Sequence, residues 1–309
     1  MKSIIFRFTI ILVVSVWTAF STSLQAAKIR KNLTYTEHVL EDRYKYGDGE
    51  RCFQWDKMGI RLDSLMAYDS EYPVFGVLQN YKSSAGNAPL VKNPQKDRWN
   101  SYTDSLGTER KNAIPLYLLA DTVYPARYGR DGTLVILGKD SADYNEIRIP
   151  GSEQSFWVPS SYVTLIGPVT FKKVIFVDRT NQNAAVLERN DSVWEVRSMV
   201  PITTGLDAPP FKRATPIGCF VVLAQIPRMY YLHDGNDEIA GFAPYASRFC
   251  GGAYLHGVPL TRLEGPLVES SPTLGTTPRS HRCVRNYTSH ALYLYDWATK
   301  YDTLVFVYD

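Results

Sequence analysis

Short apolar runs separated by polar turns make up most of the second half of the chain. Residues 173–178, 184–187 and 193–196 are apolar runs, and polar residues lie between them. Short apolar runs bounded by turn residues predict buried strands joined as hairpins. The same pattern extends upstream through 112–168, where the turn expected at 128–132 ends in Asp-Gly. We therefore predict a mainly β protein with some α structure.

Two segments have helical rather than strand periodicity. Residues 52–66 carry an incomplete apolar stripe, and in 288–299 the side chains of Leu292, Tyr295 and Ala298 recur at helical spacing. We predict one helix over each segment. The second helix would begin shortly after a cysteine, Cys283, whose position matters for the chemistry considered below.

Changes in the pattern divide the chain into four parts. Residues 1–27 have a basic start, an apolar run and small residues at the end, which predicts a cleaved secretory signal peptide. The apolar run is shorter than the roughly 20 residues that span a bilayer. We therefore expect an exported protein without stable membrane insertion after cleavage, an uncleaved anchor being the alternative. The other parts are an N-terminal α+β module over 28–111, a small β-barrel over 112–168 and a β-rich domain over 169–309.

Composition excludes two classes of protein. The chain has 34 basic and 31 acidic side chains, a net charge of +3, which is too small to neutralise the phosphates of a nucleic-acid partner. Four cysteines are too few for a disulfide-dense scaffold. No pair of cysteines or histidines has the spacing of metal ligands, so we expect neither a metal nor a cofactor.

Cys283 has the surroundings of a reactive thiol. His281, Arg282 and Arg285 flank it in the sequence, and His256 ends an apolar run that is followed by a glycine. A nearby histidine or guanidinium lowers the pKa of a thiol, and the thiolate is the nucleophile. The arginines would also attract a substrate carboxylate. The alternative is a small buried hydrophobic side chain, the commoner role of a lone cysteine.

Four pieces in this order resemble a known family. The run Ser280-His281-Arg282-Cys283-Val284-Arg285, preceded by His256-Gly257 and by Thr215-Pro216-Ile217-Gly218, resembles the L,D-transpeptidase catalytic domain of bacterial cell walls, the YkuD-type family, over 169–309. The resemblance implies that Cys283 is the nucleophile, that His256 is the general base and that the Gly257 carbonyl orients the imidazole. It also implies an oxyanion hole of backbone N–H groups around Arg282 and Cys283. The substrate-binding residues implied are Tyr254, Ser280, His281, Arg282 and Arg285.

The function implied is transfer through a thioester acyl-enzyme. The enzyme would act on peptidoglycan stem peptides in the periplasm or cell wall of a bacterium, release the terminal D-alanine, and form a crosslink or attach a wall-bound protein as acyl acceptor. Two alternatives remain open at this point. One is an L,D-carboxypeptidase or crosslink hydrolase of the same fold, and the other is a non-catalytic peptidoglycan-binding protein.

The sequence departs from the family pattern in two places. Arg282 stands where the family has glycine, so a backbone with positive φ would be strained there. In addition, 23 residues separate His256 from Ser280, which is a long spacer. We interpret the spacer as either a lid over the substrate or a solvated surface insertion.

Two further expectations concern the remaining parts of the chain. The run Trp157-Val158-Pro159-Ser160-Ser161-Tyr162-Val163 resembles the ending of the bacterial Src-homology-type barrel. If Cys283 is catalytic, at most one intrachain disulfide can form among the other three cysteines. We expect it between Cys219 and Cys250, with Cys52 left over.

Overall fold

The computed structural model describes residues 26–71, 73–91, 94–96, 102–104, 106, 112–118 and 123–309. The predicted signal peptide lies outside these residues except for Ala26 and Ala27. The fold is mainly β, as predicted, with two α-helices, α1 (Trp55–Glu71) and α2 (Thr288–Trp297). Both helices fall on the segments that have helical periodicity. No helix in the described part of the chain combines the length and apolarity needed to cross a membrane.

Three sheets account for most of the strands. The central sheet has the order β1 (Lys28–Lys31), β15 (Val193–Pro201), β14 (Asn183–Asn190), β13 (Lys173–Asp178), β21 (Thr303–Tyr308), β16 (Gly218–Val221). The five-stranded sheet has the order β11 (Ser155–Pro159), β10 (Tyr144–Arg148), β9 (Leu134–Asp140), β4 (Val74–Leu78), β12 (Val163–Pro168). The four-stranded sheet has the order β17 (Ala224–Leu232), β18 (Ile239–Cys250), β19 (Ala253–His256), β20 (Val284–Arg285).

The remaining elements are short. Three two-stranded pairs are β2 (Arg43–Tyr46) with β3 (Gly49–Cys52), β5 (Gln95–Lys96) with β6 (Tyr102–Thr103), and β7 (Ala113–Leu116) with β8 (Arg127–Arg130). Two 3₁₀ turns are η1 (Tyr81–Ser83) and η2 (Ser160–Tyr162). The turn predicted at 128–132 is shorter than expected, because Arg127–Arg130 form a strand. Gly129 packs in this strand so closely that a Cβ there would lie 2.6 Å from the Leu78 side chain, so a larger residue would require Leu78 to shift.

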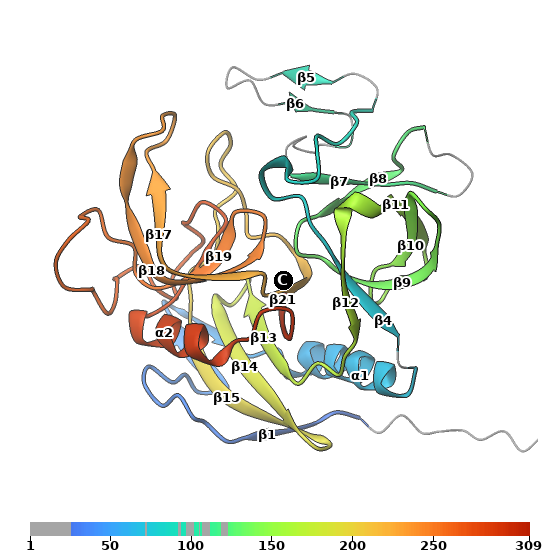
Figure 1. Ribbon diagram of the computed structural model, residues 1–309. Coiled ribbons are helices and arrows are strands. Elements are labelled where there is room, and N and C mark those ends of the chain that lie inside the picture. The colour runs from blue at the N-terminus through green and yellow to red at the C-terminus, as the bar shows by residue number, and fades with distance from the viewer. Residues whose placement is uncertain are drawn as a thin grey trace, which may run out of the picture.

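The central sheet is buried on both faces, which explains its near-continuous apolar strands. Alternate residues of β13 point to opposite sides: Val174 and Phe176 join a core with α1, β4 and β9, whereas Ile175 and Val177 join a core with β18, β19 and α2. Figure 1 shows the same arrangement, with the five-stranded sheet and α1 on one side and the four-stranded sheet and α2 on the other. The central sheet is therefore the support for both neighbouring layers.

The expected disulfide between Cys219 and Cys250 is wrong. All four cysteines are free thiols. Cys219 belongs to the core on the α1 side of the central sheet, and Cys250 belongs to the core on the α2 side. The sheet separates the two thiols, because side chains on opposite faces of a strand layer cannot meet.

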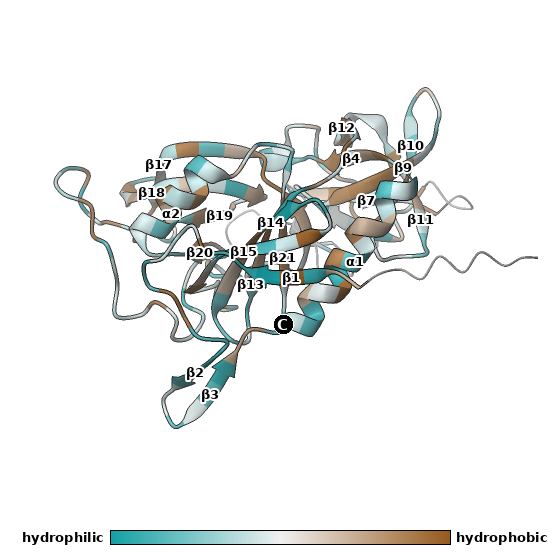
Figure 2. Cartoon of the chain, turned by 90° about the horizontal axis from the view of Figure 1, so that it is seen from below, coloured by the Kyte–Doolittle hydropathy of each residue, from teal (hydrophilic) through white to brown (hydrophobic). Residues whose placement is uncertain are grey.

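The segment 28–111 contributes strands to both larger sheets. β1 pairs in parallel with β15, and β4 lies between β9 and β12. The β2–β3 hairpin projects from the rest of the chain and is mainly hydrophilic (Figure 2). From this hairpin the Arg51 guanidinium donates to the carbonyls of Gly275 and Thr276 at 2.5 and 2.6 Å. The segment therefore holds part of the long spacer that precedes Ser280.

Candidate active site

Pairing between β19 and β20 brings the predicted nucleophile and base together. The two strands run parallel, with Leu255 opposite Val284 and His256 opposite Arg285. Leu255 and Val284 point into the core on the α2 side of the central sheet. Because side chains alternate along a strand, His256 and Arg285 point to the opposite face. Cys283, which directly precedes β20, lies on that face as well.

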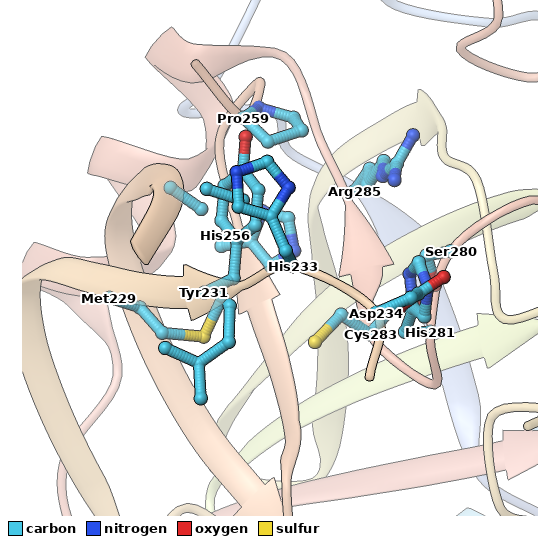
Figure 3. A pocket seen from close by; sticks show the side chains of 13 residues that line it. Met229, Tyr231, His233, Asp234, His256, Pro259, Ser280, His281, Cys283 and Arg285 are labelled. Atoms are coloured by element: carbon cyan, nitrogen blue, oxygen red, sulfur yellow. The ribbon is translucent and has the colours of Figure 1, made fainter. Parts of the chain in front are cut away.

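A cavity of about 420 Å³ opens on this face. Its surface is mostly apolar and includes Met229, Tyr231 and Ala243 of the β17–β18 hairpin, and the turn of the same hairpin adds the polar His233 and Asp234. Figure 3 shows Cys283 and His256 among the side chains around the cavity, with the Cys283 sulfur directed toward the side of Met229. Among the residues predicted from the sequence, the cavity is lined by His256, Ser280, His281, Cys283 and Arg285.

His256 is held in one tautomer by its neighbour. The imidazole is 3% exposed, and its Nδ1 lies 2.6 Å from the carbonyl oxygen of Gly257. A carbonyl oxygen only accepts hydrogen bonds, so Nδ1 carries the proton and Nε2 is left as an acceptor. Burial lowers the pKa of His256 to about 4, against the opposing effect of the Gly257 carbonyl, and Arg285 lowers it further. The imidazole is therefore neutral at pH 7.

The Cys283 thiol is buried and neutral in the resting site. Sγ donates weakly to the Gly252 carbonyl at 3.6 Å. Burial raises the pKa of Cys283 to about 11, while the Tyr254 backbone, Arg285 and Arg282 act in the opposite direction. A thiol and a neutral imidazole thus share the cavity. The arrangement suits proton transfer from sulfur to nitrogen during attack rather than a preformed ion pair.

Arg285 brings an unsatisfied cationic group to the cavity. Its Nε is buried and makes no hydrogen bond to any residue that the structure describes. Burial lowers the pKa of Arg285, although a guanidinium stays charged at neutral pH. A buried N–H group without a partner is costly unless an anionic group or a carbonyl accepts from it. The position is therefore suited to a carboxylate or carbonyl of a bound substrate.

Two hydroxyl groups fix the backbone around Cys283. The Thr215 hydroxyl donates to the Arg282 carbonyl at 2.8 Å and accepts from the Gly205 N–H at 2.8 Å, and the Ser280 hydroxyl donates to the Cys283 carbonyl at 2.5 Å. In a trans peptide the C=O and the next N–H point in opposite directions. Fixing the Arg282 carbonyl therefore fixes the direction of the Cys283 N–H. The sequence identifies Thr215 only as part of a motif. Its role depends on a contact with a residue 67 positions away, which the spacing of residues does not reveal.

Comparison with known protein families finds a match over the segment that carries these residues. Residues 172–307 match the sequence model of the L,D-transpeptidase catalytic domain, YkuD. This segment is an L,D-transpeptidase catalytic domain. The family recognised from the four motifs is therefore confirmed. No curated protein matches the chain.

Solved structures with similarity to the chain share little sequence with it. A fused Zn-dependent amidase/peptidase/peptidoglycan-binding domain-containing protein from Clostridium acetobutylicum is 20% identical, with 46% of this chain and 53% of that chain covered and a TM-score of 0.33. An L,D-transpeptidase from Mycobacterium smegmatis is 19% identical, with 56% and 80% covered and a TM-score of 0.37. An L,D-transpeptidase from Mycobacterium tuberculosis is 18% identical, with 64% and 77% covered and a TM-score of 0.35. The chain thus spans about half the length of the first of these proteins.

Arg282 departs from the L,D-transpeptidase pattern in its backbone as well as its side chain. Its φ is 100°, in the region that favours glycine. The strain expected from the sequence is therefore present. The Arg282 side chain does not line the cavity of Cys283 but a second cavity, described below.

Tyr254 also lies away from the cavity of Cys283 and His256. Its side chain is 7% exposed, packs in a small cluster with Cys283 and Ala246, and forms a side-chain hydrogen bond with Tyr81 of η1. It is not among the residues that line the cavity. A contact between Tyr254 and substrate stays a prediction. The contacts that Tyr254 makes in the structure are those of a residue that packs against Cys283.

The tip of the β17–β18 hairpin touches the catalytic segment. Asp234, in the turn of this hairpin, lies 3.0 Å from Nε2 of His281, and both side chains are nearly half exposed. The long spacer after His256 pairs with the same hairpin, since Leu260 and Phe242 exchange backbone hydrogen bonds. Hairpin and spacer therefore both border the entrance of the L,D-transpeptidase cavity.

Within the described part of the chain, one group of side chains has the ligand types and proximity of a metal site. It consists of Glu37, His38 and Glu269, all exposed. His38 already contacts Glu269 at 2.9 Å and stacks on Tyr287. The group is remote in sequence from the L,D-transpeptidase motifs, and none of its members lines the cavity of Cys283.

Proposed function

We propose that this protein is a cysteine-dependent L,D-transpeptidase that is exported and acts on peptidoglycan stem peptides in a bacterial cell wall. The observation that carries the proposal is the shared cavity of Cys283 and His256, with Nε2 of the imidazole left as a proton acceptor. Arg285, with its unpaired Nε, supplies a cationic site two residues after the nucleophile. The family of residues 172–307 supplies the reaction class.

The first half-reaction forms the thioester. The Cys283 sulfur attacks the carbonyl carbon of the peptide bond that follows the third stem residue, while His256 Nε2 accepts the thiol proton. The Cys283 N–H, fixed through Thr215, donates to the oxyanion that forms. The C–N bond then breaks, and the imidazolium gives its proton to the departing D-alanine amine. The product is an acyl group joined to Sγ.

The second half-reaction resolves the thioester. An amine of a neighbouring stem, or of a wall-attached protein, attacks the same carbonyl carbon and passes its proton to His256. The C–S bond breaks, and the imidazolium returns the proton to the sulfur. Water in place of the amine gives a carboxypeptidase by the same steps. The apolar walls of the cavity favour the amine, because they exclude water around the acyl group.

Purified protein incubated with muropeptides tests the proposal, with products identified by mass. Loss of D-alanine together with a new dimer supports transfer, and loss without a dimer supports hydrolysis. Cys283→Ala should abolish both, whereas Cys52→Ala, which removes a thiol outside the cavity, should retain them. A carbapenem should add its mass to the wild-type chain and to Cys52→Ala only. Binding of muropeptides without turnover or adduct would instead indicate the non-catalytic protein.

A further inference from the structure

The turn Asp131–Gly132, which joins β8 to β9, contacts the catalytic domain directly. Gly132 has a φ of 87°, and a Cβ there would lie 1.9 Å from the carbonyl oxygen of Phe249 in β18. A side chain at this position would therefore clash with backbone, and the positive φ also favours glycine. The Gly132 carbonyl accepts from the Val221 N–H at 2.9 Å. The turn thus packs against strands of the matched segment 172–307.

Asp131 is the buried centre of this contact. Its side chain is 1% exposed, and both carboxylate oxygens accept hydrogen bonds. Oδ1 accepts from the Asn80 N–H at 2.9 Å, whereas Oδ2 accepts from Arg248 at 2.6 Å and from the Gly251 N–H at 3.0 Å. Arg248 and Gly251 belong to the catalytic domain, and Asn80 lies upstream of it. One carboxylate therefore joins the two parts of the chain.

Arg248 extends the contact to the other polar group of Gly251. The Arg248 side chain is 13% exposed, and its guanidinium lies over the Tyr81 ring, 4.5 Å from the centroid. The same Nη1 that pairs with Asp131 lies 3.4 Å from the Gly251 carbonyl oxygen. The ion pair therefore contacts Gly251 at both its N–H and its carbonyl.

Gly251 and Gly252 form the turn between β18 and β19, and this turn touches the predicted nucleophile. Cys250 and Ala253 pair across it. Glycine has more conformational freedom than any other residue, so a turn of two glycines depends on outside contacts for its position. The Gly252 carbonyl accepts from the Cys283 Sγ at 3.6 Å. Displacement of the turn would therefore release the thiol.

We propose that Asp131 is a positioning residue for Cys283: with Arg248 it fixes the Gly251–Gly252 turn, which in turn holds the sulfur in place. The inference rests on the proposed function, in which Cys283 is the nucleophile. Asp131 lies outside the matched segment 172–307, and no described residue upstream of that segment lines the cavity of Cys283. The upstream part of the chain thus contributes to the reaction without contacting the substrate.

The rate at which iodoacetamide alkylates Cys283 at pH 8 tests this role in the full chain, with the modified residue identified by peptide mass. In Asp131→Asn the amide accepts at one of the two oxygen positions only, and Arg248→Gln removes the guanidinium. Each change should free the thiol from its acceptor and raise the alkylation rate about threefold, because loss of an acceptor favours the thiolate. The double variant should be no faster than either single variant, since both changes act on one turn.

The two single variants separate positioning from charge. Asp131→Asn removes a negative charge and Arg248→Gln removes a positive one. A purely electrostatic effect on the thiol would therefore change the two alkylation rates in opposite directions. That result overturns the proposal, and so do rates equal to that of the wild type in all three variants.

Two controls separate positioning from loss of the fold. Gln79→Ala removes another contact between the same parts of the chain, to the Tyr301 hydroxyl at 2.9 Å, and should leave the alkylation rate of Cys283 unchanged. Alkylation of the buried Cys219 reports unfolding. If a single variant unfolds, the double variant decides, because it leaves no unpaired buried charge. Alkylation of Cys219 in the double variant as well would show that the pair stabilises the fold instead, and would overturn the proposal.

Acylation by a carbapenem distinguishes this inference from the proposed function. Asp131→Asn and the double variant should form the adduct about tenfold more slowly, because a small displacement of the reacting sulfur reduces the rate. Absence of an adduct in the wild type contradicts the proposed function, yet the alkylation rates still decide whether Asp131 positions the sulfur. Faster alkylation with acylation at the wild-type rate would show that the turn holds the resting thiol without a role in attack, which contradicts the inference.

Discussion

The two cavities that border the catalytic segment have opposite chemical character. The catalytic cavity has a mostly apolar surface, and its ionisable Cys283 and His256 are both neutral at rest. A second cavity, of about 590 Å³, borders the same segment and is lined by many polar and charged residues, among them Arg179, Asp207 and Thr215. The short segment 280–283 therefore lies between a mostly apolar cavity, which contains Cys283 and His256, and a more polar cavity, which Arg282 lines. A guanidinium on one side of the segment can still influence the thiol on the other.

Replacement of the general base should have the largest effect on the catalytic side. His256→Gln removes the proton acceptor, and loss of a general base typically lowers the rate by about 10²- to 10⁴-fold. The readout is the rate of carbapenem adduct formation by intact mass at pH 7. An adduct rate equal to that of the wild type would show that another group accepts the thiol proton.

Thr215 contacts the segment between the two cavities, so its substitution tests whether a residue of the second cavity affects the reaction at Cys283. Thr215 is among the residues that line the second cavity, and its hydroxyl fixes the Arg282 carbonyl and, through it, the Cys283 N–H. Thr215→Val removes this donor with little change in shape, and we expect acylation to slow by about 10- to 100-fold, within the range of a lost oxyanion contact. Thr215→Ser retains the hydroxyl and should recover most of the rate.

The control for this experiment is the midpoint of urea unfolding of both variants. Similar stability with different acylation rates supports a positioning role for the hydroxyl. If Thr215→Ser is as slow as Thr215→Val, the methyl group rather than the hydrogen bond is responsible, and the assigned role is wrong.

The local hydrophobic pattern and the order of the motifs were enough to predict several elements around Cys283. The apolar run at 173–178 became β13, the helical spacing at 288–299 became α2, and the motif around Cys283 identified the family. In each case the information lies within a short stretch of sequence or in the order of such stretches. Hairpins and single helices depend on these local signals.

Contacts between distant parts of the chain could not be predicted from the sequence, because they leave no signal within a short stretch. Nothing local indicates that β4 inserts between β9 and β12, that Cys219 and Cys250 lie on opposite faces of the central sheet, or that Arg130 and Arg282 line the same cavity. That cavity brings together residues that are far apart in the sequence. The sequence could flag Arg282 as unusual but could not show which cavity its side chain lines.

Acid should destabilise the fold through two buried histidines. Burial lowers the pKa of His256 to about 4 and of His290 to about 3, the latter also through repulsion by His38. Between these values and about 6.5, the unfolded chain binds protons that the folded chain does not, so stability falls as pH decreases. We expect a loss on the order of 2 kcal/mol per histidine from pH 7 to pH 4.

The two histidines can be distinguished by substitution. His290 is enclosed between Ser198 and Asn286, at 2.9 and 3.0 Å, and does not line either cavity. His290→Asn should reduce the dependence of the unfolding free energy on pH while leaving the pH dependence of acylation in place. Urea unfolding at pH 7 and pH 5 measures the first quantity. An unchanged slope would mean that His290 does not remain neutral in the folded protein.

The smallest expected effect concerns the strain at Arg282. Glycine adopts a φ of 100° without a Cβ penalty, so Arg282→Gly should be more stable than Arg282→Ala by about 1 kcal/mol. The free energies come from urea unfolding at pH 7. Equal stability of the two variants would indicate that the segment relaxes when the arginine is removed, and that the side chain itself imposes the positive φ.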